Sequence, residues 1–219
     1  TRLLRGPVHF AKKRSKAMAQ LQRTAEGLAE YAKRCLCIPH VYVWDANGEY
    51  ITHALLDALS KKYPDWYTPQ RLAARRALAG CGVRGWDCIG LIKSYVWGDY
   101  HQGNTQYYTE ESDFCTRTLI QQQLVKGDIG TLPETPGLVL FKPGHVGVYI
   151  GGGKAIESTY TMPASAYTRC WEHMGDGSAP CCSAYDSAPD EPSRLGGLVE
   201  TAVSERPWTH WLQYPGIDY

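Results

Sequence analysis

The first half of the chain carries apolar residues at the spacing of amphipathic helices. Between 10 and 36 they recur every three or four positions, with Lys, Arg and Glu on the opposite face. This pattern predicts a helix that ends before Pro39. The apolar positions that define it are Leu21, Ala25, Leu28, Ala32 and Leu36. Similar spacing predicts two helices over 50–80, interrupted around 63–65, and a further helical piece over 114–126.

The second half of the chain has the character of strands, with β-prone segments separated by glycine and proline turns. Strands are expected over 41–44, 138–141, 145–150, 154–159 and 208–214. Turn residues at 45–48 close the first of them, and the polar stretches 98–112 and 161–197 are expected to be loops. Because helices come first and antiparallel strands follow, the order of elements predicts an α+β fold.

Composition and charge exclude several classes of protein. The chain has 219 residues, is 43% hydrophobic and 21% charged, and carries a net charge of +1, which is typical of one folded domain. No apolar run approaches the roughly 20 residues of a membrane span, and the balanced charge gives no argument for nucleic-acid binding. Residues 1–34 nevertheless hold nine Lys or Arg against two Glu. This basic segment is either a solvated helix face or a contact for an anionic polymer such as teichoic acid.

The eight cysteines do not indicate a metal site. There is no Cys-x-x-Cys pair, and neither Cys35-Ile-Cys37 nor Cys181-Cys182 has the usual spacing of zinc ligands. We therefore expect no metal and assign no disulfides from the sequence. No secretory apolar region follows the basic start. Because the chain opens at Thr1 and not at Met, the possibility of a longer precursor stays open.

Cys88 is the first candidate for chemistry, because a helix is expected to start near it. The dipole and free N–H groups of a helix start stabilise a thiolate, and they can also receive an oxyanion. Asp87 fits the N-cap, and Gly85 fits a sharp turn into the helix. Such a thiolate should react near neutral pH, faster than the other cysteines. The alternative is a buried cysteine that only fills apolar space.

His145 and Glu157 are the second candidate pair. Strand alternation sets His145 and Gly147 on one face of their strand, with Val146 and Val148 on the face toward the core. Gly147 leaves room beside the imidazole for another group. If Gly151 centres a hairpin, Glu157 lies directly opposite His145, about 5 Å away at Cβ, and can orient the ring. The alternative is an ordinary cross-strand pair on the surface.

Four segments occur in an order that resembles one enzyme family. Val-Tyr-Val-Trp at 41–44 is followed by Asp-Cys-x-Gly-Leu-Ile at 87–92, Gly-His-Val-Gly-Val-Tyr-Ile-Gly at 144–151 and Lys-Ala-Ile-Glu at 154–157. This set is similar to the NlpC-type cysteine peptidases of bacterial cell walls. The resemblance covers about 26–48, 82–98 and 137–160. It divides the chain into a basic helical extension over 1–25 and a peptidase domain over 26–219, with insertions at about 49–84 and 161–197.

The resemblance implies a papain-like core that hydrolyses peptidoglycan stem peptides, typically beside D-glutamate. Cys88 would be the nucleophile, His145 the general base and Glu157 the residue that orients the base. Tyr42 would lie beside the nucleophile, where its hydroxyl helps to bind the reacting carbonyl, and Asp87 would contact the amino end of the substrate. The family implies no cofactor, and we expect a monomer located outside the cell or in the cell envelope.

The chain departs from the family pattern at several positions. Ile89 replaces the usual Ser after the nucleophile, and Glu157 replaces a third residue that is often His. These differences and the insertion at 49–84 bear on the substrate preference. Three alternatives stay open: an amidase of the related CHAP type, a transacylase that uses the same thiol, and a non-catalytic wall-binding module of the same fold.

Overall fold

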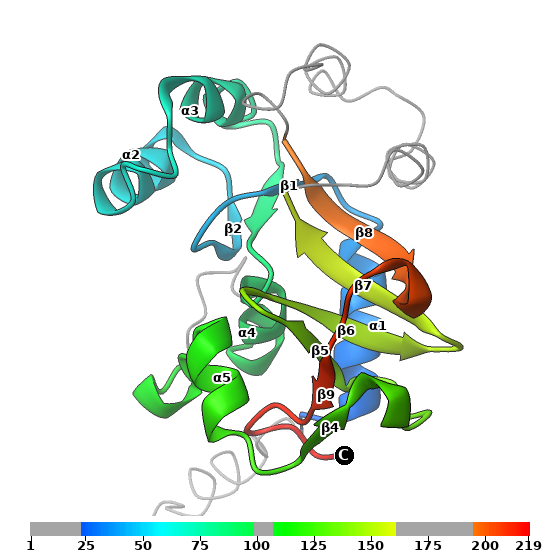
Figure 1. Cartoon of the computed structure of the whole chain (residues 1–219). Helices are drawn as coiled ribbons and strands as arrows, with labels where there is room; N and C mark the ends of the chain where they lie inside the picture. Colours follow the sequence, from blue (N-terminus) through cyan, green and yellow to red (C-terminus); the bar gives the residue numbers. More distant parts are fainter. Residues whose placement is uncertain (1–22, 99–106, 161–194) are drawn as a thin grey trace, which may run out of the picture.

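The computed structural model describes residues 23–98, 107–160 and 195–219, which form an α+β fold, as predicted (Figure 1). The helices are α1 (Ala25–Cys35), α2 (His53–Lys62), α3 (Pro69–Arg76), α4 (Gly90–Val96) and α5 (Thr116–Gln122). The strands are β1 (His40–Tyr42), β2 (Asn47–Tyr50), β3 (Arg84–Trp86), β4 (Lys126–Asp128), β5 (Val139–Lys142), β6 (His145–Gly151), β7 (Lys154–Thr159), β8 (Gly197–Ala202) and β9 (His210–Leu212). Short 3-10 turns are η2 (Glu110–Ser112), η3 (Ile129–Thr131) and η5 (Val203–Glu205). No helix within these three ranges is long and apolar enough to cross a membrane.

The strands form two sheets in the described part of the chain. The larger one has the order β4-β9-β5-β6-β7-β8, and its paired neighbours are antiparallel. The smaller one has the order β1-β3-β2, with β1 parallel to β3. The prediction that the helices precede the antiparallel sheet is therefore confirmed for the larger sheet. The strands of the smaller sheet, in contrast, alternate with helices along the chain.

The main core lies between the larger sheet and helices α1 and α4. Val146 and Val148 of β6 are fully buried there with Leu28 of α1 and Leu91 of α4. Figure 1 shows α1 crossing behind this sheet. Tyr149 belongs to a separate cluster with Leu138, Leu140, Ala155 and Trp208. The predicted alternation along β6 is confirmed.

Helix α1 is the described part of the helix predicted over 10–36; residues 10–22 lie outside the description. The Thr24 hydroxyl accepts a 3.0 Å hydrogen bond from the Gly27 N–H and caps its start. The helix ends at Cys35, before Pro39, as the sequence predicts. The basic extension predicted over 1–25 is therefore described only at its last three residues.

The insertion predicted at about 49–84 forms a helical hairpin with its own small core. Helices α2 and α3 are interrupted at 63–65, as expected, and Pro69 occupies the first turn of α3. Leu56 and Leu59 of α2 pack with Val41 and Val43 beside the smaller sheet. Figure 1 shows the two helices at the end of the molecule where β1 and β2 lie.

Four strands were not predicted, and one glycine has a different role. β2 begins at Asn47, inside the turn predicted over 45–48, and β3, β4 and β8 have too few residues or too little alternation to stand out in the sequence. Gly85 lies inside β3, where an added Cβ would come within 2.8 Å of Val43 Cγ2 and 2.7 Å of Ile51 Cδ1. The residue is glycine because two side chains occupy that space, and not because the chain turns sharply. The loop predicted over 161–197 lies largely outside the description, and its last residue, Gly197, begins β8.

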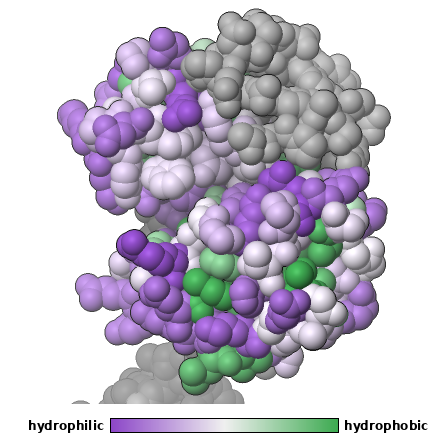
Figure 2. Space-filling view, viewed as in Figure 1, coloured by the Kyte–Doolittle hydropathy of each residue, from purple (hydrophilic) through white to green (hydrophobic). Residues whose placement is uncertain are grey.

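The surface in view is mostly hydrophilic, and hydrophobic atoms gather in a few places, one of them at the bottom of the view, where the segment between α5 and β4 lies (Figure 2). Leu124 and Val125 in that segment are 95% and 47% exposed. Lys126 Nζ donates a 2.6 Å hydrogen bond to the Ile120 carbonyl, which fixes this connection to α5. The exposed pair therefore sits at a well-defined corner between helix and strand.

Candidate active site

Cys88 lies in the turn between β3 and α4, and the helix starts two residues later than predicted, at Gly90. Asp87 fixes this turn, because its Oδ1 accepts a 2.6 Å hydrogen bond from the Gly90 N–H and its Oδ2 a 3.0 Å bond from the Asp45 N–H. The predicted capping bond is thus present, although Ile89 occupies the N-cap position. An added Cβ on Gly90 would lie 2.0 Å from the Ala46 carbonyl oxygen, so only glycine fits.

The Cys88 thiol is buried, and its pKa moves opposite to the expected direction. Burial raises the pKa to about 12, and the Asp87 carboxylate adds to this rise. Backbone N–H groups of Val146, Ile89 and Cys88 itself lower it only in part. With only 7% of Cys88 exposed, the resting group is a neutral thiol rather than the thiolate that the helix start predicts.

His145 and Glu157 meet, but not in the predicted register. In the β6–β7 hairpin Val148 pairs with Ile156 and Tyr149 with Ala155, so Gly151 is not its centre. One step further, Glu157 faces Gly147, where an added Cβ would lie 3.3 Å from Glu157 Cβ. The His145 side chain reaches across diagonally, and its Nε2 lies 2.6 Å from Glu157 Oε2. The predicted directly opposed pair is wrong; the contact itself is present.

Glu157 is fully buried and has two further partners that the sequence did not reveal. Arg206 Nη2 donates a 2.8 Å hydrogen bond to Oε2, and Thr201 Oγ1 donates a 3.0 Å bond to Oε1. Burial pushes the pKa of Glu157 upward, but the hydrogen bonds and charges of His145 and Arg206 hold it below its usual value. The group is therefore a carboxylate.

The tautomer of His145 follows from these contacts. Because an ionised carboxylate only accepts hydrogen bonds, Nε2 of His145 carries the hydrogen. In a neutral ring Nδ1 is then the acceptor, as a general base requires. Trp208 stacks on this ring, with centroids 5.7 Å apart and planes 14° from parallel. Gly147 makes the room, since a Cβ there would lie 3.1 Å from Trp208 Cη2.

The turn that carries Cys88 is joined directly to the strands that carry His145 and Glu157. The N–H of Val146, the residue after His145, reaches the Cys88 sulfur and lowers its pKa. Ser158, next to Glu157, donates a 2.8 Å hydrogen bond from its hydroxyl to the Trp86 carbonyl. These two contacts hold the turn that carries Cys88 against β6 and β7.

Tyr42 also lies near the thiol. The pKa of its hydroxyl is raised by burial first, and then by the charges that Cys88 and Asp87 can carry. The backbone of Tyr42 is held from the insertion, because Arg75 Nε donates a 2.9 Å hydrogen bond to its carbonyl. Asp87 uses both carboxylate oxygens for backbone N–H groups, and burial raises its pKa to about 6.

Trp66 of the insertion lies among three aromatic rings, one of which is that of Tyr42. The Trp66 ring lies 5.9 Å from the Tyr42 ring, 6.1 Å from the Trp44 ring and 6.0 Å from the Tyr160 ring. The Arg75 guanidinium lies 4.8 Å from the Trp66 centroid, which is a cation–π distance. The insertion therefore contributes side chains to the surroundings of Tyr42.

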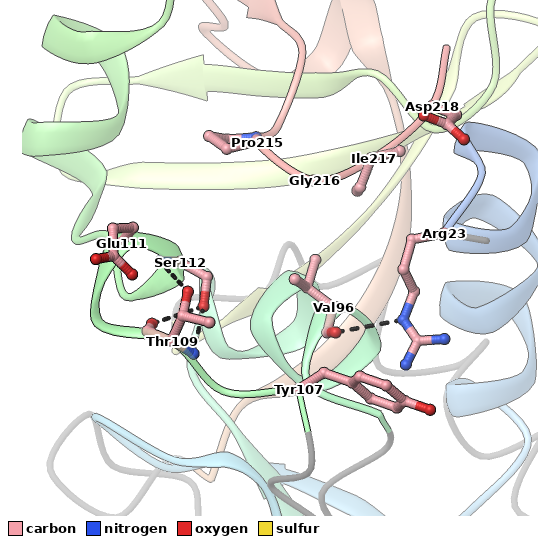
Figure 3. A pocket seen from close by; sticks show the side chains of 10 residues that line it. All are labelled: Arg23, Val96, Tyr107, Thr109, Glu111, Ser112, Pro215, Gly216, Ile217 and Asp218. Atoms are coloured by element: carbon pink, nitrogen blue, oxygen red, sulfur yellow. Dashed lines mark hydrogen bonds between the residues drawn. The ribbon is translucent and has the colours of Figure 1, made fainter. Parts of the chain in front are cut away.

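A cavity of about 770 Å³ lies elsewhere, beside the C-terminal end of α4 (Figure 3). Arg23 lines this cavity and donates a 3.3 Å hydrogen bond from Nε to the Val96 carbonyl. Its lining residues are Arg23, Val96, Tyr107, Thr109, Glu111, Ser112, Pro215, Gly216, Ile217 and Asp218. Cys88, His145 and Glu157 are not among them, so this cavity is separate from the candidate site.

Within the described ranges, no group of three or more His, Cys, Asp or Glu side chains could hold a metal ion. Comparison of the chain with protein-family models, with curated proteins and with solved structures finds no match in any of the three. The geometry of Cys88, His145 and Glu157 therefore carries the functional argument, together with the motifs in the sequence.

Proposed function

We propose that the chain is a cysteine hydrolase with a papain-like core of the NlpC type, in which Cys88, His145 and Glu157 act as nucleophile, general base and orienting acid. The observation that carries this proposal is the 2.6 Å contact between His145 Nε2 and the buried Glu157 carboxylate, next to the strand position that reaches the Cys88 sulfur. A nucleophile, a base and a group that orients the base are the parts that acyl transfer by a thiol needs.

The reaction begins from the protonated thiol of Cys88. His145 Nδ1 takes the proton of the Cys88 thiol as the sulfur attacks the carbonyl carbon of an amide. The N–H groups of Cys88 and Ile89, which point toward the sulfur, receive the developing oxyanion. The imidazolium then protonates the leaving amine, and the amide C–N bond breaks. His145 next takes a proton from water, whose oxygen displaces the sulfur, and the thiol is restored.

Peptidoglycan stem peptides are the proposed substrates, with cleavage next to D-glutamate. The ordered motifs of the sequence support this choice. The same resemblance supports a location outside the cell or in the cell envelope, action as a monomer, and no cofactor. Contact of the basic residues near the start with an anionic wall polymer belongs to the same proposal.

A non-catalytic wall-binding module is the second candidate. One observation favours it: the Cys88 thiol is buried and has a pKa raised to about 12, and a resting thiolate would be more reactive. The buried contacts of Glu157 with His145 and Arg206 weigh against it, because a binding surface does not need an oriented imidazole.

The test is mass spectrometry of soluble fragments released from purified peptidoglycans of different stem chemistry. The wild-type chain should release peptides whose masses identify the bond, and the Cys88→Ala variant should release none. Cys115→Ala is the matched control, because Cys115 is an exposed free cysteine, and it should behave like the wild type. Equal release by wild type and Cys88→Ala would refute the nucleophile. If neither the wild type nor Cys88→Ala releases fragments and both still bind the polymer, the binding module is favoured.

A further inference from the structure

The Glu157 carboxylate is a buried charge that needs compensation. Its side chain is completely inaccessible to water, and its polar partners in the described part of the chain are His145, Arg206 and Thr201. Thr201 is neutral, so among the described residues that contact the Glu157 carboxylate only Arg206 and a protonated His145 could balance its charge. Leaving a carboxylate without a cation in such a place is strongly unfavourable.

Arg206 is built into this position. It follows η5 directly, and 13% of its side chain is exposed. Besides the hydrogen bond from Nη2 to Oε2, its Nε lies 2.8 Å from Oε1, at an angle that does not make a second hydrogen bond. The guanidinium therefore spans both oxygens of Glu157 and restricts the rotation of the carboxylate. A planar, permanently charged group suits this task better than a lysine.

We propose that Arg206 is a positioning residue for the candidate catalytic pair: it orients the Glu157 carboxylate toward His145 Nε2 and balances the charge of that carboxylate. The inference deepens the proposed function and rests on it for its catalytic meaning. The part that concerns charge balance rests on the contacts of Glu157 alone and does not need the proposed function.

The sign of the effect follows from the charges around His145. Glu157 of β7 favours the imidazolium, whereas Arg206 disfavours it. Lys142 of β5, which pairs with His145, adds positive charge, and burial followed by the charge of Arg206 lowers the pKa of that lysine. Cys88 is a neutral thiol, and Trp208 is uncharged. Removing the charge of Arg206 must therefore raise the proton affinity of the His145–Glu157 pair.

The imidazole signals of His145 in proton–carbon NMR, assigned with a His145→Gln variant, report this proton affinity without any substrate. Loss of the charge in Arg206→Gln should raise the apparent pKa of His145 by about one to two units. Arg206→Lys keeps the charge and should leave that pKa near the wild-type value. Glu205→Gln is the matched control, since Glu205 is an exposed neighbour, and it should leave the titration unchanged.

The pH profile of turnover supplies the second readout. The acidic limb should move to higher pH in Arg206→Gln by the same amount as the NMR titration. In Arg206→Lys the limb should stay in place while the maximal rate falls, because one ammonium cannot span both oxygens. If Arg206→Gln does not fold, the maximal rate of Arg206→Lys still tests the orienting role, and a rate equal to that of the wild type would overturn it.

Two results would overturn the inference: a wild-type titration in Arg206→Gln, or a displaced titration in Arg206→Lys. Failure of the hydrolase proposal looks different, because the chain would then release no fragments while His145 still responded to Arg206. The two proposals can therefore fail separately.

Discussion

The hydroxyl of Ser158 and the carbonyl of Trp86 form a buried 2.8 Å hydrogen bond that joins β7 to the smaller sheet. Trp86 is two residues before Cys88, and Ser158 directly follows Glu157. One bond thus links the backbone on the nucleophile side to the backbone on the acid side.

Ser158→Ala should therefore loosen the site as well as the fold. The Trp86 carbonyl would lose this partner inside the protein, and we expect the free energy of unfolding to fall by about 1–3 kcal/mol. Urea denaturation measures this loss. Ser204→Ala, at an exposed position, is the control and should have little effect. An unchanged midpoint for Ser158→Ala would show that the bond contributes nothing.

Glu157→Gln should slow hydrolysis at least tenfold, an order-of-magnitude expectation for a weakened base. The amide keeps the size of the side chain but has one accepting oxygen, while His145, Thr201 and Arg206 all donate to this group. The measurement is the rate of fragment release compared with the wild type. A rate equal to that of the wild type would reduce Glu157 to a packing residue.

The same residue should give the protein an acid-sensitive stability. Because its pKa is depressed in the folded state, the unfolded chain binds more protons below its own pKa of about 4.3. The contribution of Glu157 is complete above that pH and is lost as the pH falls through the lower, folded value. Urea midpoints from pH 7 to pH 3 should therefore decline more steeply for the wild type than for Glu157→Gln.

Cys88 should react slowly with iodoacetamide at neutral pH. Its pKa of about 12 means that the thiolate fraction rises about tenfold per pH unit between 6 and 9, without a plateau. Cys115 is exposed, and hydrogen bonds with Thr118 lower its pKa, so it should react first. Peptide mapping by mass spectrometry separates the two sites. A plateau for Cys88 below pH 8 would indicate a preformed thiolate–imidazolium pair.

Gly90→Ala should displace the turn that holds Cys88. The new methyl group would meet the Ala46 carbonyl oxygen at 2.0 Å, and backbone cannot yield as a flexible side chain does. We expect a loss of about 1–3 kcal/mol, as for overpacking elsewhere, and a larger loss of activity. In contrast, Gly130→Ala should be mild, since the nearest atom there is 3.2 Å away in a side chain. Thermal unfolding of both variants checks this.

The sequence was informative wherever a residue's neighbours along the chain determine its surroundings. Alternation placed Val146 in the core and His145 on the other face, and the helix-breaking residues at 63–65, which include Pro64, located the break between α2 and α3. The capping bond of Asp87 was likewise predictable, because its partner Gly90 is only three residues away.

The failures came from interactions that depend on the third dimension. Pairing shifts at Gly151, and the positive φ angles of Gly151, Gly152 and Gly153 show that three residues shape the turn; the sequence does not say which of them lies at the centre. Arg206 lies 49 residues after Glu157, and no local pattern connects the two. The pKa of the Cys88 thiol is also raised, whereas the sequence predicts that it is lowered, because the effect of burial outweighs that of the N–H groups around the sulfur.

The helical hairpin between β2 and β3 has its two ends tied together. The Ile51 N–H donates a 2.8 Å hydrogen bond to the Val83 carbonyl, and the Gly80 N–H donates a 3.0 Å bond to the Ile51 carbonyl. When the two ends of a chain segment lie side by side, the entropic cost of closing the segment grows only slowly with its length. A change in the length of this hairpin therefore costs little closure entropy, as long as Arg75 and Trp66 keep their contacts with Tyr42. The exposed parts of the hairpin, away from those two residues, are the natural place for an engineered insertion.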